Sequence, residues 1–169
     1  MMIRHATPAD IPAITAIYRH YVLNDTATFE EESPTDAEMR ARFDKIVAAG
    51  LPYVVAEDDG RIEGYAYLNY FRTRSAYRFT LEDSIYLDPA ATGKGLGSAL
   101  LQRLLDDGER WGARQIVAVI GGNNPASVAL HRRFGFEDVG VMKSVGLKFG
   151  QWLDTPILQK QLGDGSIPD

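Results

Sequence analysis

The sequence contains no cysteine among its 169 residues. This absence excludes disulfide bonds, thiolate metal ligands and any covalent thioester formed on the protein itself. If the protein takes part in thiol chemistry, the thiol must therefore come from a ligand.

Long apolar runs and basic segments are also missing. No stretch approaches the roughly 18 apolar residues of a membrane span, and residues 1–6 carry no apolar core ahead of a small-residue cleavage site. Lysines and arginines number 18 against 23 aspartates and glutamates, and the formal charge of -5 disfavours non-specific binding to nucleic acid. We therefore expect a cytoplasmic protein without a membrane or nucleic-acid partner.

The composition is that of an ordinary globular protein. Hydrophobic residues make up 45% of the chain and charged residues 24%, which suffices for one sizeable core at this length. We predict a single domain over residues 1–162. The Gly/Pro-containing residues 163–169 are predicted to form a flexible tail.

The most informative stretch is a predicted strand, residues 80–87, that leads through alternate glycines into a predicted helix, residues 96–111. Gly93, Gly95 and Gly97 lie where the strand ends and the helix begins. Glycine admits positive φ and lets a ligand approach backbone amides, and a helix start favours anions. The stretch therefore predicts a cradle for a phosphate or diphosphate. Its spacing fits neither a Walker loop nor a dinucleotide fingerprint, and a glycine turn that binds nothing remains the alternative.

The rest of the chain alternates helical and strand patterns. Thr35 and Glu38 match a capping box, and Asp58-Asp59-Gly60 suits the turn of a hairpin. Residues 24–34 lack periodicity and predict a surface loop, which either closes over a substrate or is simply a solvated acidic segment. The other expected elements are strands at residues 3–6, 52–57, 61–72, 78–87, 115–120, 136–149 and 152–162, and helices at residues 8–22, 36–49 and 125–134. This order predicts an α/β fold whose mixed sheet is antiparallel in its N-terminal part and parallel around the glycine loop.

Several of these segments resemble successive signatures of the GCN5-related N-acetyltransferase (GNAT) superfamily. The matching segments are Ile85-Tyr86-Leu87, Gly93-Lys94-Gly95-Leu96-Gly97-Ser98, Asn124-Pro125-Ala126-Ser127 and the run from Leu130 to Phe136. Residues 79–86 and the run Lys148-Phe149-Gly150-Gln151-Trp152-Leu153-Asp154 are similar to the phosphinothricin acetyltransferase branch, which includes acetyltransferases of methionine sulfoximine and methionine sulfone.

The resemblance implies the GNAT fold, with splayed strands at the cofactor site, acetyl-CoA as co-substrate and no metal. The residues that it assigns to cofactor binding are Ile85, Tyr86, Leu87, Gly93, Lys94, Gly95, Leu96, Gly97, Ser98, Asn124 and Ser127. Asn124 also suits a plain helix cap that needs no ligand. The chain has Thr92 where the family usually has Arg or Gln. Because the cradle binds the anion mainly through backbone amides, we expect weaker side-chain contacts to the anion but not a loss of binding.

The resemblance also implies the catalytic residues. An α-amino group is largely protonated at pH 7, so acetyl transfer to it needs a base, and Glu82 occupies the position of the branch's catalytic glutamate. Burial or the neighbouring Asp83 would have to raise the pKa of Glu82, although the two side chains point to opposite faces of a strand. His131 stands where many relatives have a tyrosine acid, and it is either a proton donor or an ordinary core or surface histidine.

The residues assigned to substrate binding are Arg72, Thr73, Arg74, Glu82, Asp83, Ser84, Phe29 and Lys148. A guanidinium suits the α-carboxylate of an amino acid. We therefore expect an acyltransferase that acetylates the α-amine of a small amino acid or analogue by direct attack, in a family that commonly forms homodimers. Acetylation of a polyamine or a peptide N-terminus, and a non-catalytic acyl-CoA-binding domain, are the alternatives.

Overall fold

The computed structural model describes all 169 residues, and its elements follow the predicted order. The strands are β1 (Met2–His5), β2 (Tyr53–Asp58), β3 (Arg61–Tyr70), β4 (Thr80–Leu87), β5 (Gln115–Val119), β6 (Glu137–Lys148) and β7 (Gln151–Gln161). The helices are α1 (Ile11–Asn24), α2 (Asp36–Ala48), α3 (Leu96–Trp111) and α4 (Pro125–Arg133), with short 3-10 turns at Pro8–Asp10, Ser75–Tyr77, Pro89–Ala91 and Gly121–Asn123.

The starts of the helices show how local sequence sets their bounds. At α2 the predicted capping box is present, because Glu38 N–H donates to the Thr35 hydroxyl at 3.1 Å and Thr35 N–H donates to the Glu38 carboxylate at 2.7 Å. The first helix begins later than predicted. Residues from Pro8 to Asp10 form a separate 3-10 turn, and α1 starts at Ile11 with Pro12 in its first turn.

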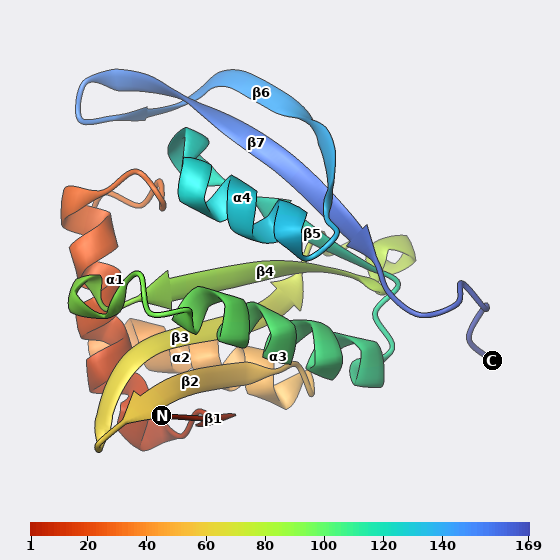
Figure 1. Cartoon of the computed structure of the whole chain (residues 1–169), viewed down its shortest axis with the longest axis horizontal. Coiled ribbons are helices and arrows are strands. Elements are labelled where there is room, and N and C mark those ends of the chain that lie inside the picture. Colours follow the sequence, from red (N-terminus) through yellow and green to blue (C-terminus); the bar gives the residue numbers. More distant parts are fainter.

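The seven strands form one mixed sheet in the order β1-β2-β3-β4-β5-β7-β6 (Figure 1). Strands β1 to β4 pair antiparallel, β4 and β5 pair parallel, and β7 lies antiparallel between β5 and β6. The predicted mixed sheet is thus confirmed, and its one parallel pair adjoins the glycine loop.

The helices cover both faces of the sheet. Tyr86 packs edge-on against Tyr18 of α1, with ring centroids 5.1 Å apart, so the even-numbered residues of β4 face α1. The odd-numbered residues of β4 face α3 and α4, since Asp83 bonds to His131 of α4. Glu82 and Asp83 therefore lie on opposite faces, as predicted. Helix α3 packs against β2, β3 and β4, and its buried residues are Leu96, Leu100, Leu101, Leu104, Leu105, Asp107 and Gly108.

The segment between β3 and β4 is longer than predicted. Strand β3 ends at Tyr70 instead of Arg72, and β4 begins at Thr80 instead of Arg78. The intervening residues 71–79 form an exposed connection that contains the Ser75–Tyr77 turn. Residues 163–169 hold no helix or strand. None of the helices has the length and apolar character needed to cross a membrane.

Candidate active site

Strands β4 and β5 pair over a short stretch and then separate, and we call the place where they separate the fork. Their parallel ladder has three residue pairs, the last of which joins Glu82 to Val117, although β4 continues to Leu87. From Asp83 onward, the β4 backbone has no strand partner on its β5 side. This unpaired edge opens onto a cavity of about 920 Å³ between α4, the glycine loop and the loop after α1.

Most of the predicted site residues meet at this cavity. Those that line it are Phe29, Glu82, Asp83, Ser84, Ile85, Tyr86, Leu87, Gly93, Gly95, Gly97, Ser98, Asn124, Ser127 and His131. Those that do not line it are Arg72, Thr73, Arg74, Lys94, Leu96 and Lys148. The structure thus gathers residues from five separate segments and leaves six of the predicted ones outside.

The glycine loop forms one end of the cavity. Gly93 and Gly95 have φ values of 78° and 80°, in the left-handed region that glycine favours, and Gly95 is the N-cap of α3. A Cβ at either glycine would meet no other atom within 4 Å, so the space beside these amides is open. The first amides of α3 lack partners within the helix and carry its positive dipole end. This geometry can hold a diphosphate through the backbone.

Two predicted residues of the glycine loop have other positions. The Lys94 ammonium lies 3.8 Å from the Glu63 carboxylate in an exposed ion pair. The Leu96 side chain is buried in the core beneath the start of α3. Any contact of these two residues with an anion would therefore come from their backbone amides.

Asn124 caps α4 as its sequence position predicts. Its side-chain oxygen accepts the Ser127 N–H at 3.2 Å, and both residues line the cavity. The asparagine thus has a structural partner, and its amide nitrogen remains available to a ligand.

Glu82 is the last residue of β4 that pairs with β5, and it lies at the fork itself. Burial, and secondly the negative charge of Asp83, raise the pKa of Glu82 to about 7, and the nearby Arg72 opposes this rise. A carboxyl group with this pKa is half ionised near neutral pH, so it can accept a proton from an amine and release it again.

His131 and Asp83 form a buried pair on the other face of β4. His131 Nε2 lies 2.7 Å from Asp83 Oδ2, and His131 Nδ1 lies 2.7 Å from the Ser127 carbonyl oxygen. Both ring nitrogens are therefore occupied by protein acceptors. Direct proton donation from His131 to a ligand would require one of these bonds to break.

The loop after α1 reaches the cavity through Phe29 and is held by Lys148. The Lys148 side chain is 1% exposed, and its ammonium donates to the backbone carbonyls of Tyr21, Asp25 and Thr28 at 3.2, 2.6 and 2.7 Å. These three bonds use all three N–H groups, which leaves none for a substrate. In this structure the Lys148 ammonium therefore fixes the loop.

The cationic segment between β3 and β4 lies outside the cavity. Arg72, Thr73 and Arg74 are exposed, and the Arg72 guanidinium lies 4.9 Å from the centre of the Phe71 ring. The influence of Arg72 on the pKa of Glu82 places its charge near the fork.

Sequence reasoning missed two cavity residues whose roles depend on tertiary contacts. The Tyr21 hydroxyl of α1 donates to the Leu87 carbonyl at 2.6 Å, and Tyr21 lines the cavity. Thr155 of β7 lines the cavity because β7 inserts beside β5. A local pattern cannot reveal either contact, since the partners are far apart in sequence.

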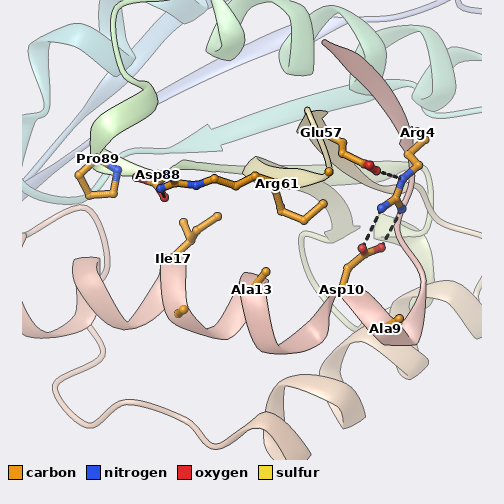
Figure 2. Close-up of a pocket in the computed structure, with 12 residues that line it drawn as sticks. Arg4, Ala9, Asp10, Ala13, Ile17, Glu57, Arg61, Asp88 and Pro89 are labelled. Carbon is orange, nitrogen blue, oxygen red and sulfur yellow. Dashed lines mark hydrogen bonds and ion pairs between the residues drawn. The ribbon is translucent and has the colours of Figure 1, made fainter.

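A second cavity, of about 540 Å³, lies between α1 and the β2–β3 turn (Figure 2). Its charged side chains are paired with one another: Arg4 contacts Asp10 and Glu57, and Arg61 contacts Asp88. No group of three or more histidine, aspartate or glutamate side chains could hold a metal ion anywhere in the chain. The fork cavity is therefore the candidate active site.

Comparisons with known proteins agree with this geometry. A model of the Acetyltransferase (GNAT) family matches residues 14–136. A phosphinothricin N-acetyltransferase of Alcaligenes faecalis is 53% identical over 95% of this chain and 83% of its own length. An L-methionine sulfoximine/L-methionine sulfone acetyltransferase of Salmonella typhimurium is 40% identical over 100% of this chain and 99% of its own length. The crystal structure of a phosphinothricin acetyltransferase from Sinorhizobium meliloti in complex with AcCoA has a TM-score of 0.96 and 54% identity, covering 98% of this chain and 90% of that one.

Proposed function

This chain belongs to the acetyltransferase (GNAT) family, and from that premise we propose that it moves acetyl from acetyl-CoA to the α-amine of a small amino acid or analogue. Phosphinothricin, methionine sulfoximine and methionine sulfone are the acceptors that the names of its relatives suggest. The observation that carries the proposal is the fork: an anion cradle at one end of the β4 edge and a base with a pKa of about 7 at the other.

The glycine loop and the β4 edge of the cavity suit two parts of acetyl-CoA. The amides of Gly93, Lys94, Gly95, Leu96, Gly97 and Ser98 would hold the diphosphate, and the free backbone edge of Ile85, Tyr86 and Leu87 would pair with the pantetheine arm. Asn124 and Ser127 of α4 would contact the arm from the opposite wall. When bound, the co-substrate supplies an acetyl thioester whose carbonyl carbon the amine attacks.

Glu82 would act as the general base. Its carboxylate accepts the proton that the amine must lose on forming the amide bond, and ionisation near pH 7 makes it competent under neutral conditions. The backbone N–H near Ile85 would stabilise the oxyanion that develops on the carbonyl. A thiolate leaves readily, so we assign His131 a role through its charge and hydrogen bonds, not direct donation.

The acceptor would bind on the α1 face of the fork, where Glu82 and Ser84 point. Arg72 acts electrostatically on Glu82, and an arginine of the connection that holds Arg72, Thr73 and Arg74 would pair with the acceptor carboxylate. Phe29 would supply an apolar wall for the acceptor side chain, held in place by the Lys148-anchored loop.

A free-thiol release assay over a panel of amines tests the proposal. The panel would contain the common amino acids, phosphinothricin, methionine sulfoximine, methionine sulfone, a polyamine and a short peptide. We expect the amino acids and their analogues to give the highest kcat/KM. Preference for the polyamine or peptide would refute the acceptor class, and acetyl-CoA binding without any turnover would indicate a non-catalytic acyl-CoA-binding domain.

We also propose that two chains pair through the β6–β7 hairpin and that the enzyme works in the cytoplasm, where acetyl-CoA is available. The hairpin carries an unusual density of exposed apolar side chains, namely Val139, Val141, Met142, Val145, Leu147, Phe149 and Trp152. Trp152 is 68% exposed. A concentration of exposed apolar side chains on one hairpin is typical of a subunit interface.

A further inference from the structure

The Asp83 carboxylate lies next to both of the other titratable groups of the site, Glu82 and His131. It follows Glu82 directly in β4, and it lies 2.7 Å from the His131 ring on the opposite face. The side chains of Asp83 and His131 are 2% and 5% exposed. Water therefore screens neither the bond between them nor the charge on Asp83.

The hydrogen bonds of His131 define where its protons lie. The Ser127 carbonyl oxygen can only accept, so Nδ1 of the ring carries a hydrogen. The 2.7 Å contact between Nε2 and Asp83 Oδ2 needs a second proton between them. Burial alone would lower the pKa of His131. The hydrogen bond and the charge of Asp83, together with the hydrogen bond to the Ser127 carbonyl, act in the opposite direction, and the net effect is a raised pKa. These contacts favour the doubly protonated form of the ring.

The other oxygen of Asp83 is not compensated. Oδ1 is buried and has no hydrogen-bond partner within the protein, while Asp83 lines the cavity beside Glu82. The other titratable or charged groups that act on or near Glu82 are Arg72, Tyr67 and Tyr86. Arg72 opposes the effect of Asp83, and the two tyrosines are neutral at pH 7 because burial raises their pKa values further. No charged group besides Asp83 acts on His131, whose ring otherwise contacts Phe136.

We propose that Asp83 is a positioning residue for both groups, which keeps the proton on the His131 ring and holds back the ionisation of Glu82. The inference rests on the proposed function for its catalytic meaning. During turnover the amine proton goes to the Glu82 carboxylate, and the proton between His131 and Asp83 stays in place. With Asp83 and His131 so arranged, Glu82 can both accept and release a proton near neutral pH.

The first test observes His131 directly and needs no turnover. The chain has three histidines, so imidazole nitrogen-15 NMR can follow them separately, with His131→Gln used to assign the resonance. At about pH 7.5, above the ordinary histidine pKa of about 6.5, His131 should keep both ring protons in the unmodified protein and lose one in Asp83→Asn. A His131 that is already neutral at this pH in the unmodified protein would overturn the proposal.

The second test follows kcat against pH at saturating acetyl-CoA and acceptor. Asp83→Asn removes the negative charge next to Glu82 together with the more distant positive charge of the His131 ring, so the acid limb of the profile should move to lower pH by a fraction of a pH unit. Asp107→Asn is the matched control, because Asp107 is another buried, ion-paired aspartate but lies on α3 away from the cavity.

The Asp107→Asn control should keep the acid limb of the kcat profile at the same pH as the unmodified enzyme. An Asp83→Asn enzyme with lower kcat but an unmoved acid limb would refute the proposal, since a purely structural role lowers turnover without shifting the limb. If the enzyme acetylates none of the proposed acceptors, the proposed function fails, while the NMR result still decides the state of His131.

Discussion

Replacing Glu82 with glutamine should abolish most turnover and at the same time stabilise the fold, in a way that depends on pH. Glutamine keeps the shape of the side chain but cannot ionise. Glu82 is partly buried at the fork, where burial and Asp83 raise its pKa from 4.5 to about 7. The folded protein therefore resists the charged form that catalysis requires.

The sign of the stability effect follows from proton linkage. Below about pH 4.5 Glu82 is protonated in both the folded and the unfolded chain, so it contributes no difference. Between pH 4.5 and about 7 only the unfolded chain loses the proton, and stability falls as pH rises. At roughly 1.4 kcal/mol for each pH unit the full loss is about 3 kcal/mol. Because the carboxylate is partly exposed, we reduce this to roughly 2 kcal/mol.

Urea unfolding, followed by tryptophan fluorescence at pH 4.5 and pH 8, measures this difference. Glu82→Gln should match the unmodified protein at pH 4.5 and exceed its free energy of unfolding by roughly 2 kcal/mol at pH 8. In the thiol-release assay its kcat should fall by roughly 10²- to 10⁴-fold, the usual contribution of a general base, while acetyl-CoA affinity stays within a factor of about two.

The exposed Glu109 of α3 provides a control, since Glu109→Gln removes a carboxylate far from the cavity and should change neither property. A stability difference between Glu82→Gln and the unmodified protein that is the same at both pH values would refute the reasoning, because an effect of packing alone has no reason to vary with pH.

Three further substitutions test other parts of the structure. Gly95→Ala forces alanine to a φ of 80°, so it should destabilise the protein by about 1–2 kcal/mol and weaken acetyl-CoA binding in calorimetry; unchanged affinity would contradict the proposed cradle. Lys148→Met leaves three carbonyls without their donor, so the acceptor KM should rise by roughly tenfold while acetyl-CoA affinity is kept; an equal loss of both would indicate general unfolding. Trp152→Glu places a charge on the exposed apolar hairpin and should shift the sedimentation coefficient from dimer to monomer; a monomeric unmodified protein would refute the pairing.

Much of the fold could be predicted because its signals are local. The Thr35–Glu38 capping box, the glycine at the start of α3 and the alternation of β4 each depend on residues within one turn or one strand. The resemblance of the glycine loop and of residues 124–127 to known signatures then placed both walls of the cavity. Of these two segments, Gly93, Gly95, Gly97, Ser98, Asn124, Ala126 and Ser127 line the cavity.

What could not be predicted depends on contacts between distant segments. Asp83 and His131 are 48 positions apart, and nothing in either local pattern indicates that they share a proton. Lys148 has the appearance of a cation available to a substrate, and only the tertiary fold shows that three backbone carbonyls already occupy it. The insertion of β7 beside β5, which brings Thr155 to the cavity, is likewise a matter of sheet order.

The unpaired edge of β4 also makes the free energy of unfolding depend on the concentration of the ligand that binds there. Residues 83–87 pair with β3 on one side, but on the β5 side their backbone faces the cavity, so a ligand that bonds there occupies the place of a neighbouring strand. Such a ligand binds the native chain alone and adds about 2.7 kcal/mol to its unfolding free energy at a hundred times its Kd. Saturating acetyl-CoA would therefore slow any proteolysis that proceeds through the unfolded chain.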